Sequence, residues 1–84
     1  MDNLNNLENN FSYSEGVWAA KGMIKHIATT TYGTIEQAVN VKQALIKNFE
    51  EQFGYSREME ELDPRYAYEL GILDELKKEL DGTR

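Results

Sequence analysis

The sequence predicts an all-α domain, a small bundle of three main helices plus one short helix. Apolar residues recur at spacings of three and four along three long segments, which is the period of one helix face. Capping residues precede these segments, glycines follow them, and no segment resembles a strand with a partner. We expect a single domain over residues 11–84 of the 84-residue chain, after a flexible asparagine-rich tail at residues 1–10. The spacing of Leu4, Leu7 and Phe11 leaves open one docked helical turn in that tail.

The first helix is expected over about residues 13–30. Ser12 and Glu15 have the spacing of a capping box, and Ser14 is the alternative cap. Gly33 is expected to supply the left-handed stop beyond the helix. The apolar stripe of this helix consists of Val17, Ala20, Ile24, Ile27 and Ala28.

The second helix, over residues 35–53, has the clearest pattern in the chain. Thr34 and Gln37 form a second capping box, Gly54 ends the helix, and Tyr55 is placed to fold back on its last turn. A helix of this length spans roughly 28 Å, so we expect it to be the central helix of the domain. Its apolar stripe consists of Ile35, Ala38, Val39, Leu45, Ile46, Phe49 and Phe53.

The third main helix is expected over about residues 64–81, after a short helix near residues 56–62. Aspartate is a preferred N-cap and proline a preferred first helical residue, so Asp63 and Pro64 mark the strongest boundary in the sequence. Gly82 is the stop. The stripe of the third helix consists of Tyr66, Leu70, Leu73, Leu76 and Leu80.

Lys42 interrupts the apolar stripe of the second helix. A lysine can lay its methylene groups along an apolar surface while its ammonium group stays near water or an acid. We therefore expect a carboxylate of the third helix, Glu69 or Glu79, to lie beside it. A polar residue on a helix seam can also fix the register of an oligomer, which favours a homodimer slightly.

The net charge of −6 lies in the C-terminal part of the chain. Residues 1–47 carry four acids and four bases, whereas residues 48–84 carry eleven acids and five bases. The phosphate backbone of nucleic acids requires a basic patch, so we do not expect direct binding to nucleic acid. A helix-turn-helix centred on Gly33 fails for the same reason, because its second helix offers only Lys42 and Lys47 against three glutamates.

The composition indicates a cytoplasmic protein without a membrane partner. No apolar run approaches the roughly 18–20 residues that cross a bilayer. The N-terminal segment has no base before Lys21 and no hydrophobic stretch, so no secretory signal is expected. The chain contains no cysteine, which excludes disulfides and thiolate chemistry.

No pattern in the sequence predicts catalysis. His26 is the only histidine, and nothing near it supplies the orienting acid and the nucleophile that a general base requires. No histidine pair or calcium-loop spacing predicts a metal ligand set. We therefore expect no enzyme activity, no metal and no cofactor.

Trp18 is a candidate partner-binding residue. On a helical wheel it lies roughly 140° from the centre of the apolar stripe, beside Lys21, Gly22 and Lys25. A tryptophan outside the main apolar face is a common interface anchor. The alternative is that Trp18 packs under the N-terminal segment or against the third helix.

The acidic segment between the second and third helices, together with nearby tyrosines, is the second candidate. Tyrosine flanked by carboxylates is suited to binding basic protein surfaces. The alternatives are a solvated acidic face that maintains solubility and tyrosines that fill gaps between helices. The predicted binding residues are Trp18, Tyr55, Glu58, Glu60, Glu61, Asp63 and Tyr68.

These features favour a small acidic, non-enzymatic binding protein that inhibits or adapts a basic, nucleic-acid-handling partner protein. The chain is similar in size and charge to small acidic helical immunity proteins and nuclease inhibitors, although no motif is shared with them. Phage-encoded inhibitors of host enzymes are proteins of the same general kind. The alternative is a structural or regulatory homo-oligomer assembled through the long amphipathic helix at residues 35–53.

Overall fold

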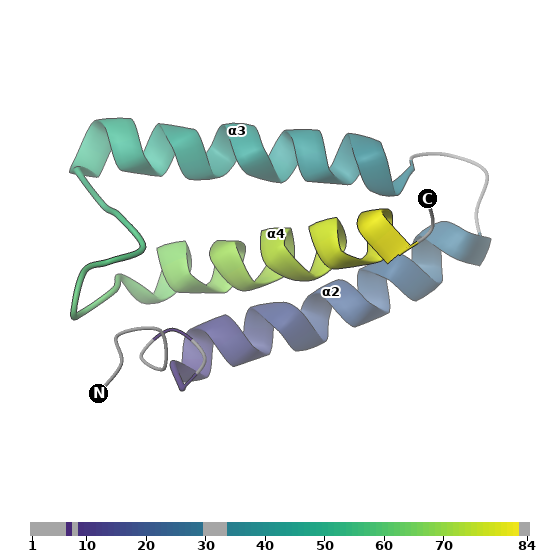
Figure 1. Ribbon diagram of the computed structural model, residues 1–84, viewed down its shortest axis with the longest axis horizontal. Helices are drawn as coiled ribbons and strands as arrows, with labels where there is room; N and C mark the ends of the chain where they lie inside the picture. Colours follow the sequence, from purple (N-terminus) through teal and green to yellow (C-terminus); the bar gives the residue numbers. More distant parts are fainter. Residues whose placement is uncertain (1–6, 8, 30–33, 83–84) are drawn as a thin grey trace.

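The computed structural model describes residues 7, 9–29 and 34–82, and this part of the chain is entirely helical apart from its connections. Three helices pack against one another, and the described residues include no strand (Figure 1). The predicted all-α bundle is therefore confirmed. The helices are α2 (Phe11–Thr29), α3 (Ile35–Phe53) and α4 (Pro64–Gly82).

Helix α4 is the central element. It lies between α2 and α3 and packs against both; α2 runs in the same direction as α4, and α3 runs in the opposite direction (Figure 1). The expectation that residues 35–53 form the central helix is therefore wrong. An apolar stripe on one face, as in α3, indicates a helix with one partner, whereas a helix buried on several sides carries apolar residues around its circumference. The buried residues of α4 are Tyr66, Ala67, Leu70, Gly71, Ile72, Leu73 and Leu76.

The start of α2 differs from the predicted start. The side chain of Asn10 accepts a hydrogen bond from the backbone N–H of Tyr13 at 3.0 Å, and its backbone oxygen accepts one from Ser14 at 3.0 Å. Asn10 is thus the N-cap, and the helix begins two residues before the predicted position. Before it, Leu7 is half-buried and packs against the core.

The predicted boundaries of α3 are confirmed. The hydroxyl of Thr34 accepts a hydrogen bond from the backbone N–H of Gln37 at 3.1 Å. Gly54 has a φ of 72° and donates its backbone N–H to the oxygen of Glu50 at 2.9 Å. This left-handed residue is where glycine is favoured, because a Cβ would be strained there.

The predicted cap of α4 is confirmed as well. The carboxylate of Asp63 accepts a hydrogen bond from the backbone N–H of Arg65 at 2.8 Å, and its backbone oxygen accepts one from Ala67 at 2.9 Å. Pro64 is the first residue of the helix. The expected stop at Gly33, the end of the first helix at residue 30 and most of the N-terminal tail lie outside the described residues.

The connection between α3 and α4, residues 54–63, contains turns and bends but no helix, so the short helix expected near residues 56–62 is wrong. A helix this short is stable only when an apolar face is packed. Leu62 packs against the core, but the side chain of Met59 is exposed. Packing of Leu62 alone does not stabilise a helical turn.

The backbones of α2 and α4 touch where each helix carries a glycine. A Cβ at Gly16 would overlap the backbone oxygen of Tyr68, and a Cβ at Gly71 would overlap the backbone oxygen of Tyr13. Alanines lie one turn from each glycine, Ala20 on α2 and Ala67 on α4, and both are fully buried. Small residues four apart on both helices therefore allow a closer approach than ordinary side chains permit.

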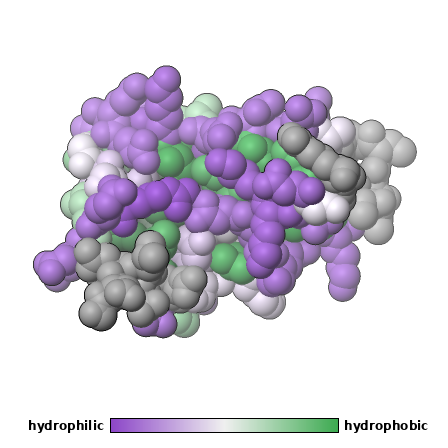
Figure 2. Space-filling model, in the orientation of Figure 1, coloured by the Kyte–Doolittle hydropathy of each residue, from purple (hydrophilic) through white to green (hydrophobic). Residues whose placement is uncertain are grey.

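Aromatic packing and one ion pair join α3 to α4. The ring of Phe49 lies 6.1 Å from that of Tyr66 and 6.3 Å from that of Tyr55, and Tyr55 folds back on the last turn of α3 as predicted. The Lys42 ammonium group lies 2.8 Å from the carboxylate of Glu69, which confirms one of its two expected partners. On the face shown in Figure 2, hydrophilic residues predominate, and hydrophobic groups show between them along the middle.

The two glycine environments predict opposite effects of the same substitution. We expect Gly71→Ala to destabilise the protein by about 1–3 kcal/mol, because the added methyl group forces α2 away from α4. Gly22→Ala is the matched control: no described atom lies within 4 Å of its Cβ position, so the higher helix propensity of alanine should stabilise the protein by up to about 1 kcal/mol. Urea unfolding of both variants measures the difference. Equal changes in the free energy of unfolding for the two variants would contradict the close backbone contact at Gly71.

Candidate functional site

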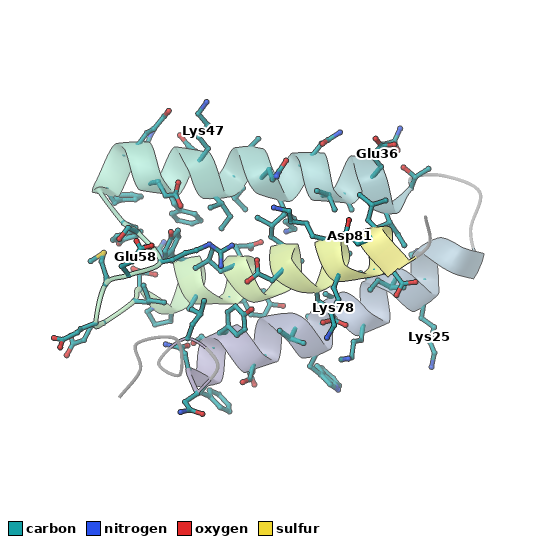
Figure 3. All side chains as sticks on the ribbon, in the orientation of Figure 1. Lys25, Glu36, Lys47, Glu58, Lys78 and Asp81 are labelled. Carbon is teal, nitrogen blue, oxygen red and sulfur yellow. The ribbon has the colours of Figure 1, made fainter. Side chains whose placement is uncertain are left out.

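The connection between α3 and α4 presents three acidic side chains to solvent. Glu58, Glu60 and Glu61 are exposed, and none of them has a hydrogen bond or ion pair with another described residue. Two large apolar side chains are exposed in the same region, Met59 at 39% and Phe53 at 54%. We call residues 58–61 the acidic loop; Glu58 is labelled at the end of the molecule where α3 leads into α4 (Figure 3).

An arginine beside the acidic loop fixes it to α4. The Arg57 guanidinium donates two hydrogen bonds to the carboxylate of Asp74, at 3.0 and 2.7 Å. This bidentate geometry is the strongest form of an arginine–carboxylate pair. The loop is therefore attached immediately before its acidic residues.

The same carboxylate also binds α2. The hydroxyl of Tyr13 donates a hydrogen bond to Asp74 at 2.7 Å, so Asp74 joins α2, α4 and the loop. Burial by itself raises the pKa of Asp74, but the hydrogen bonds from Arg57 and Tyr13 outweigh it and hold the pKa below the ordinary aspartate value. The charged form of Asp74 is thus the form that the fold favours.

The far end of the loop is held by Asp63. Its carboxylate accepts the hydroxyl hydrogen bond of Tyr55 at 3.1 Å in addition to the backbone N–H of Arg65. The bond from the Arg65 backbone, with help from the Arg65 side chain and Tyr55, lowers the pKa of Asp63. Asp63 and Tyr55 therefore position the loop, although the sequence pattern assigned both to direct contact with a partner.

Three further acids of the C-terminal part have partners inside the molecule. Glu50 accepts the hydroxyl hydrogen bond of the buried Tyr66 at 2.8 Å; burial, together with this bond, raises the pKa of Tyr66. Glu69 pairs with Lys42, and Glu75 lies 3.2 Å from the ammonium group of Lys21. These acids hold the fold, whereas the three acids of the loop have no partner among the described residues.

Trp18 lies on a different surface. Its side chain is 77% exposed on α2, so it does not pack against α4, and most of the N-terminal segment lies outside the described residues. A shallow hollow of about 350 Å³ beside it is lined by Trp18, Lys21, Gly22 and Lys25. Lys25 projects away from α4 (Figure 3). This surface is basic and aromatic rather than acidic.

Tyr68 lies apart from the acidic loop as well. It lines a hollow of about 250 Å³ that Ser12, Pro64, Arg65 and Glu69 also line. Its side chain is half-buried and packs against the core. Tyr68 thus packs where α4 meets the start of α2, whereas Tyr55 stacks on the end of α3.

Sequence reasoning missed two groups of residues. Arg57 and Asp74 are seventeen positions apart, and no local pattern indicates that they meet. The second is Phe11, which is 75% exposed on α2 and was not identified together with Trp18. Its spacing of seven from Trp18 was a visible signal, because residues seven apart share a helix face.

The described residues contain no group of three histidine, cysteine, aspartate or glutamate side chains that could hold a metal ion. None of the helices in this part of the chain combines the length and the hydrophobicity that a membrane span requires. Comparisons of the chain with protein-family models, with curated proteins and with solved structures found no significant match.

The Asp74 network predicts a pH-dependent contribution to stability. We expect Asp74→Asn to lower the free energy of unfolding at neutral pH by about 1–3 kcal/mol, because Arg57 loses its charged partner. The pKa of Asp74 is lowered in the folded state, so its contribution is present above the unfolded-state pKa and disappears as the pH falls through the folded-state pKa. The stability difference between wild type and variant should therefore shrink between about pH 5 and pH 3.

Urea unfolding at several pH values measures this difference. Asp81→Asn is the control, because Asp81 is exposed near the end of α4 and has no partner among the described residues. A wild-type advantage over Asp74→Asn that stays constant down to pH 3 would contradict the role of the charged carboxylate.

Proposed function

We propose that this protein is a small, non-enzymatic binding module that inhibits or adapts a partner protein through its acidic loop. The partner has a basic surface, such as the surface with which a nucleic-acid-handling protein holds phosphates. The observation that carries the proposal is the three exposed and unpaired carboxylates of Glu58, Glu60 and Glu61 beside exposed Phe53 and Met59.

The distribution of acids supports a binding role over a purely solubilising one. Within the C-terminal part, Glu50, Glu69 and Asp74 each have a base or a hydroxyl group as partner. The loop concentrates unpaired acids on a few consecutive residues and places apolar side chains among them. Complementary charge increases association rates and selects partners, while desolvated apolar groups supply affinity.

The loop is also preorganised. Arg57 holds one end to Asp74, and Asp63 caps α4 at the other end while it accepts a hydrogen bond from Tyr55. A loop that is already fixed loses less conformational entropy when it binds. This arrangement supports rigid docking on a partner surface, as an inhibitor or an immunity-type protein requires.

A homo-oligomer remains the second proposal for this chain. Val39 and Ile46, which belong to the apolar stripe of α3, are buried within the single chain. The stripe is therefore occupied by α4, and self-association of this chain would use another face.

Charge reversal in the loop tests the first proposal. We expect Glu60→Lys combined with Glu61→Lys to weaken partner binding about tenfold or more, because two attractive charges become repulsive. The fold should be unaffected, since neither side chain has a partner among the described residues. Asp63 is left unchanged because it caps α4.

The control variant combines Glu36→Lys with Asp81→Lys, which changes the net charge equally at the opposite end of the molecule (Figure 3). Tagged wild type and both variants are used to capture proteins from lysate at low salt and at about 1 M salt, where exposed charges are screened beyond about 3 Å. A basic protein retained by wild type and control, lost from the loop variant and released by salt would support the proposal. Equal retention by all three proteins would exclude the loop as the binding surface.

A further inference from the structure

One face of α2 is directed away from the rest of the molecule. Trp18 is two residues from Gly16 and two from Ala20, which places it about 200° around the helix from each. Because those two residues face α4, Trp18 lies on the opposite side of α2. Phe11 and Lys25 are seven residues before and after Trp18, so the three share one stripe.

Two large aromatic side chains on the outward face are largely open to solvent. Trp18 and Phe11 are 77% and 75% exposed. No described atom lies within 4 Å of a Cβ built on Gly22, so the backbone of α2 is open to a close neighbour at that point. Two large aromatics on one helix stripe, next to an open glycine, are the features of a helix-packing surface.

The order of residues along this face is complementary to itself. When two copies of α2 pair antiparallel about Trp18, residues at equal distances before and after Trp18 come to the same level. Phe11 then faces Lys25 of the other copy, as in a cation–π contact. Glu15 comes to the level of Lys21, its opposite in charge.

The antiparallel pairing also brings two small residues, Ser14 and Gly22, to the same level. Their small size lets the two helices approach closely. In a parallel pair each residue would instead face its own copy, and Lys21 and Lys25 would each repel an identical charge. The charge pattern therefore favours the antiparallel arrangement.

We infer that this face of α2, formed by Phe11, Ser14, Glu15, Trp18, Lys21, Gly22 and Lys25, binds a second copy of the chain in an antiparallel, two-fold symmetric dimer. A two-fold interface uses the same patch on both copies and must be complementary to itself. This surface is separate from the acidic loop and independent of the function proposed for it.

The dimer is weak. A single helix pair buries less than the roughly 1,200 Å² at which standard interfaces begin, so we expect a dissociation constant on the order of 100 µM. Trp18 is the only tryptophan in the chain, so its fluorescence reports directly on the interface. Its emission should shift to shorter wavelength as the chain concentration rises from about 5 µM to about 1 mM, with a parallel increase in sedimentation-equilibrium mass.

Trp18→Ala should remain a monomer over this range while its far-UV circular dichroism stays that of wild type. Val41→Ala is the matched control, because Val41 is an exposed apolar residue on α3 at 64% exposure; it should dimerise like wild type. A wild-type chain that stays monomeric at the highest concentration would overturn the inference. A dimer that persists in Trp18→Ala would place the interface elsewhere and also overturn it.

Charge variants test the antiparallel register. We expect Glu15→Lys and Lys21→Glu each to weaken self-association about tenfold, because each places like charges at one level. An equimolar mixture of the two variants restores opposite charges at both positions and should dimerise at least as well as wild type. A mixture that stays monomeric would contradict the proposed register.

Lys21→Glu also removes the ion pair with Glu75, so its fold is checked by circular dichroism first. If that variant does not fold, Glu15→Lys alone decides, since Glu15 is exposed and has no partner among the described residues. Undiminished dimerisation of Glu15→Lys would then count against the antiparallel pair.

Discussion

The backbone contact between α2 and α4 determines the rest of the structure. Because Gly16 and Gly71 leave no side chain between the helices, the two parallel helices meet in one register and at one distance. That register brings Tyr13 to Asp74 and Lys21 to Glu75. A side chain in place of either glycine would separate these pairs as well as the helices. The small residues are thus the condition under which the polar contacts between α2 and α4 can form.

The position of the acidic loop also depends on the contact between α2 and α4, because Tyr13 and Arg57 bind the same residue, Asp74. The single carboxylate of Asp74 accepts hydrogen bonds from Tyr13 on α2 and from Arg57 beside the loop. Its depressed pKa means that the network is strongest when the carboxylate is charged. The loop itself contributes little apolar burial, since Met59 is exposed. Its position therefore depends on polar bonds at both ends, and the side chains between those bonds remain available to a partner.

The sequence predicted the elements well where the information is local. The Thr34 cap, the Gly54 stop and the Asp63 cap were all identified, because a cap depends on residues within one helical turn. Which helix lies between the other two was harder to predict. A clean stripe made residues 35–53 look central, whereas α4 is central because it is apolar on more than one side. The candidate site was predicted only in part, since the pairing of Arg57 with Asp74 depends on the tertiary fold.

The two surfaces of the molecule have opposite chemistry, acidic at the loop and basic and aromatic on α2. The acidic loop lies near the N-terminal end of α2, where Arg57 and Tyr13 share Asp74 (Figure 1). An antiparallel pair of α2 helices reverses one copy relative to the other, so the two loops come to opposite ends of the dimer and do not repel each other closely.

Such a dimer presents two identical acidic loops. A partner with two basic surfaces, or a partner that is itself a dimer, would then bind more tightly through the increased effective concentration of the second loop. Weak self-association would in that case be an advantage, because the partner itself would promote assembly.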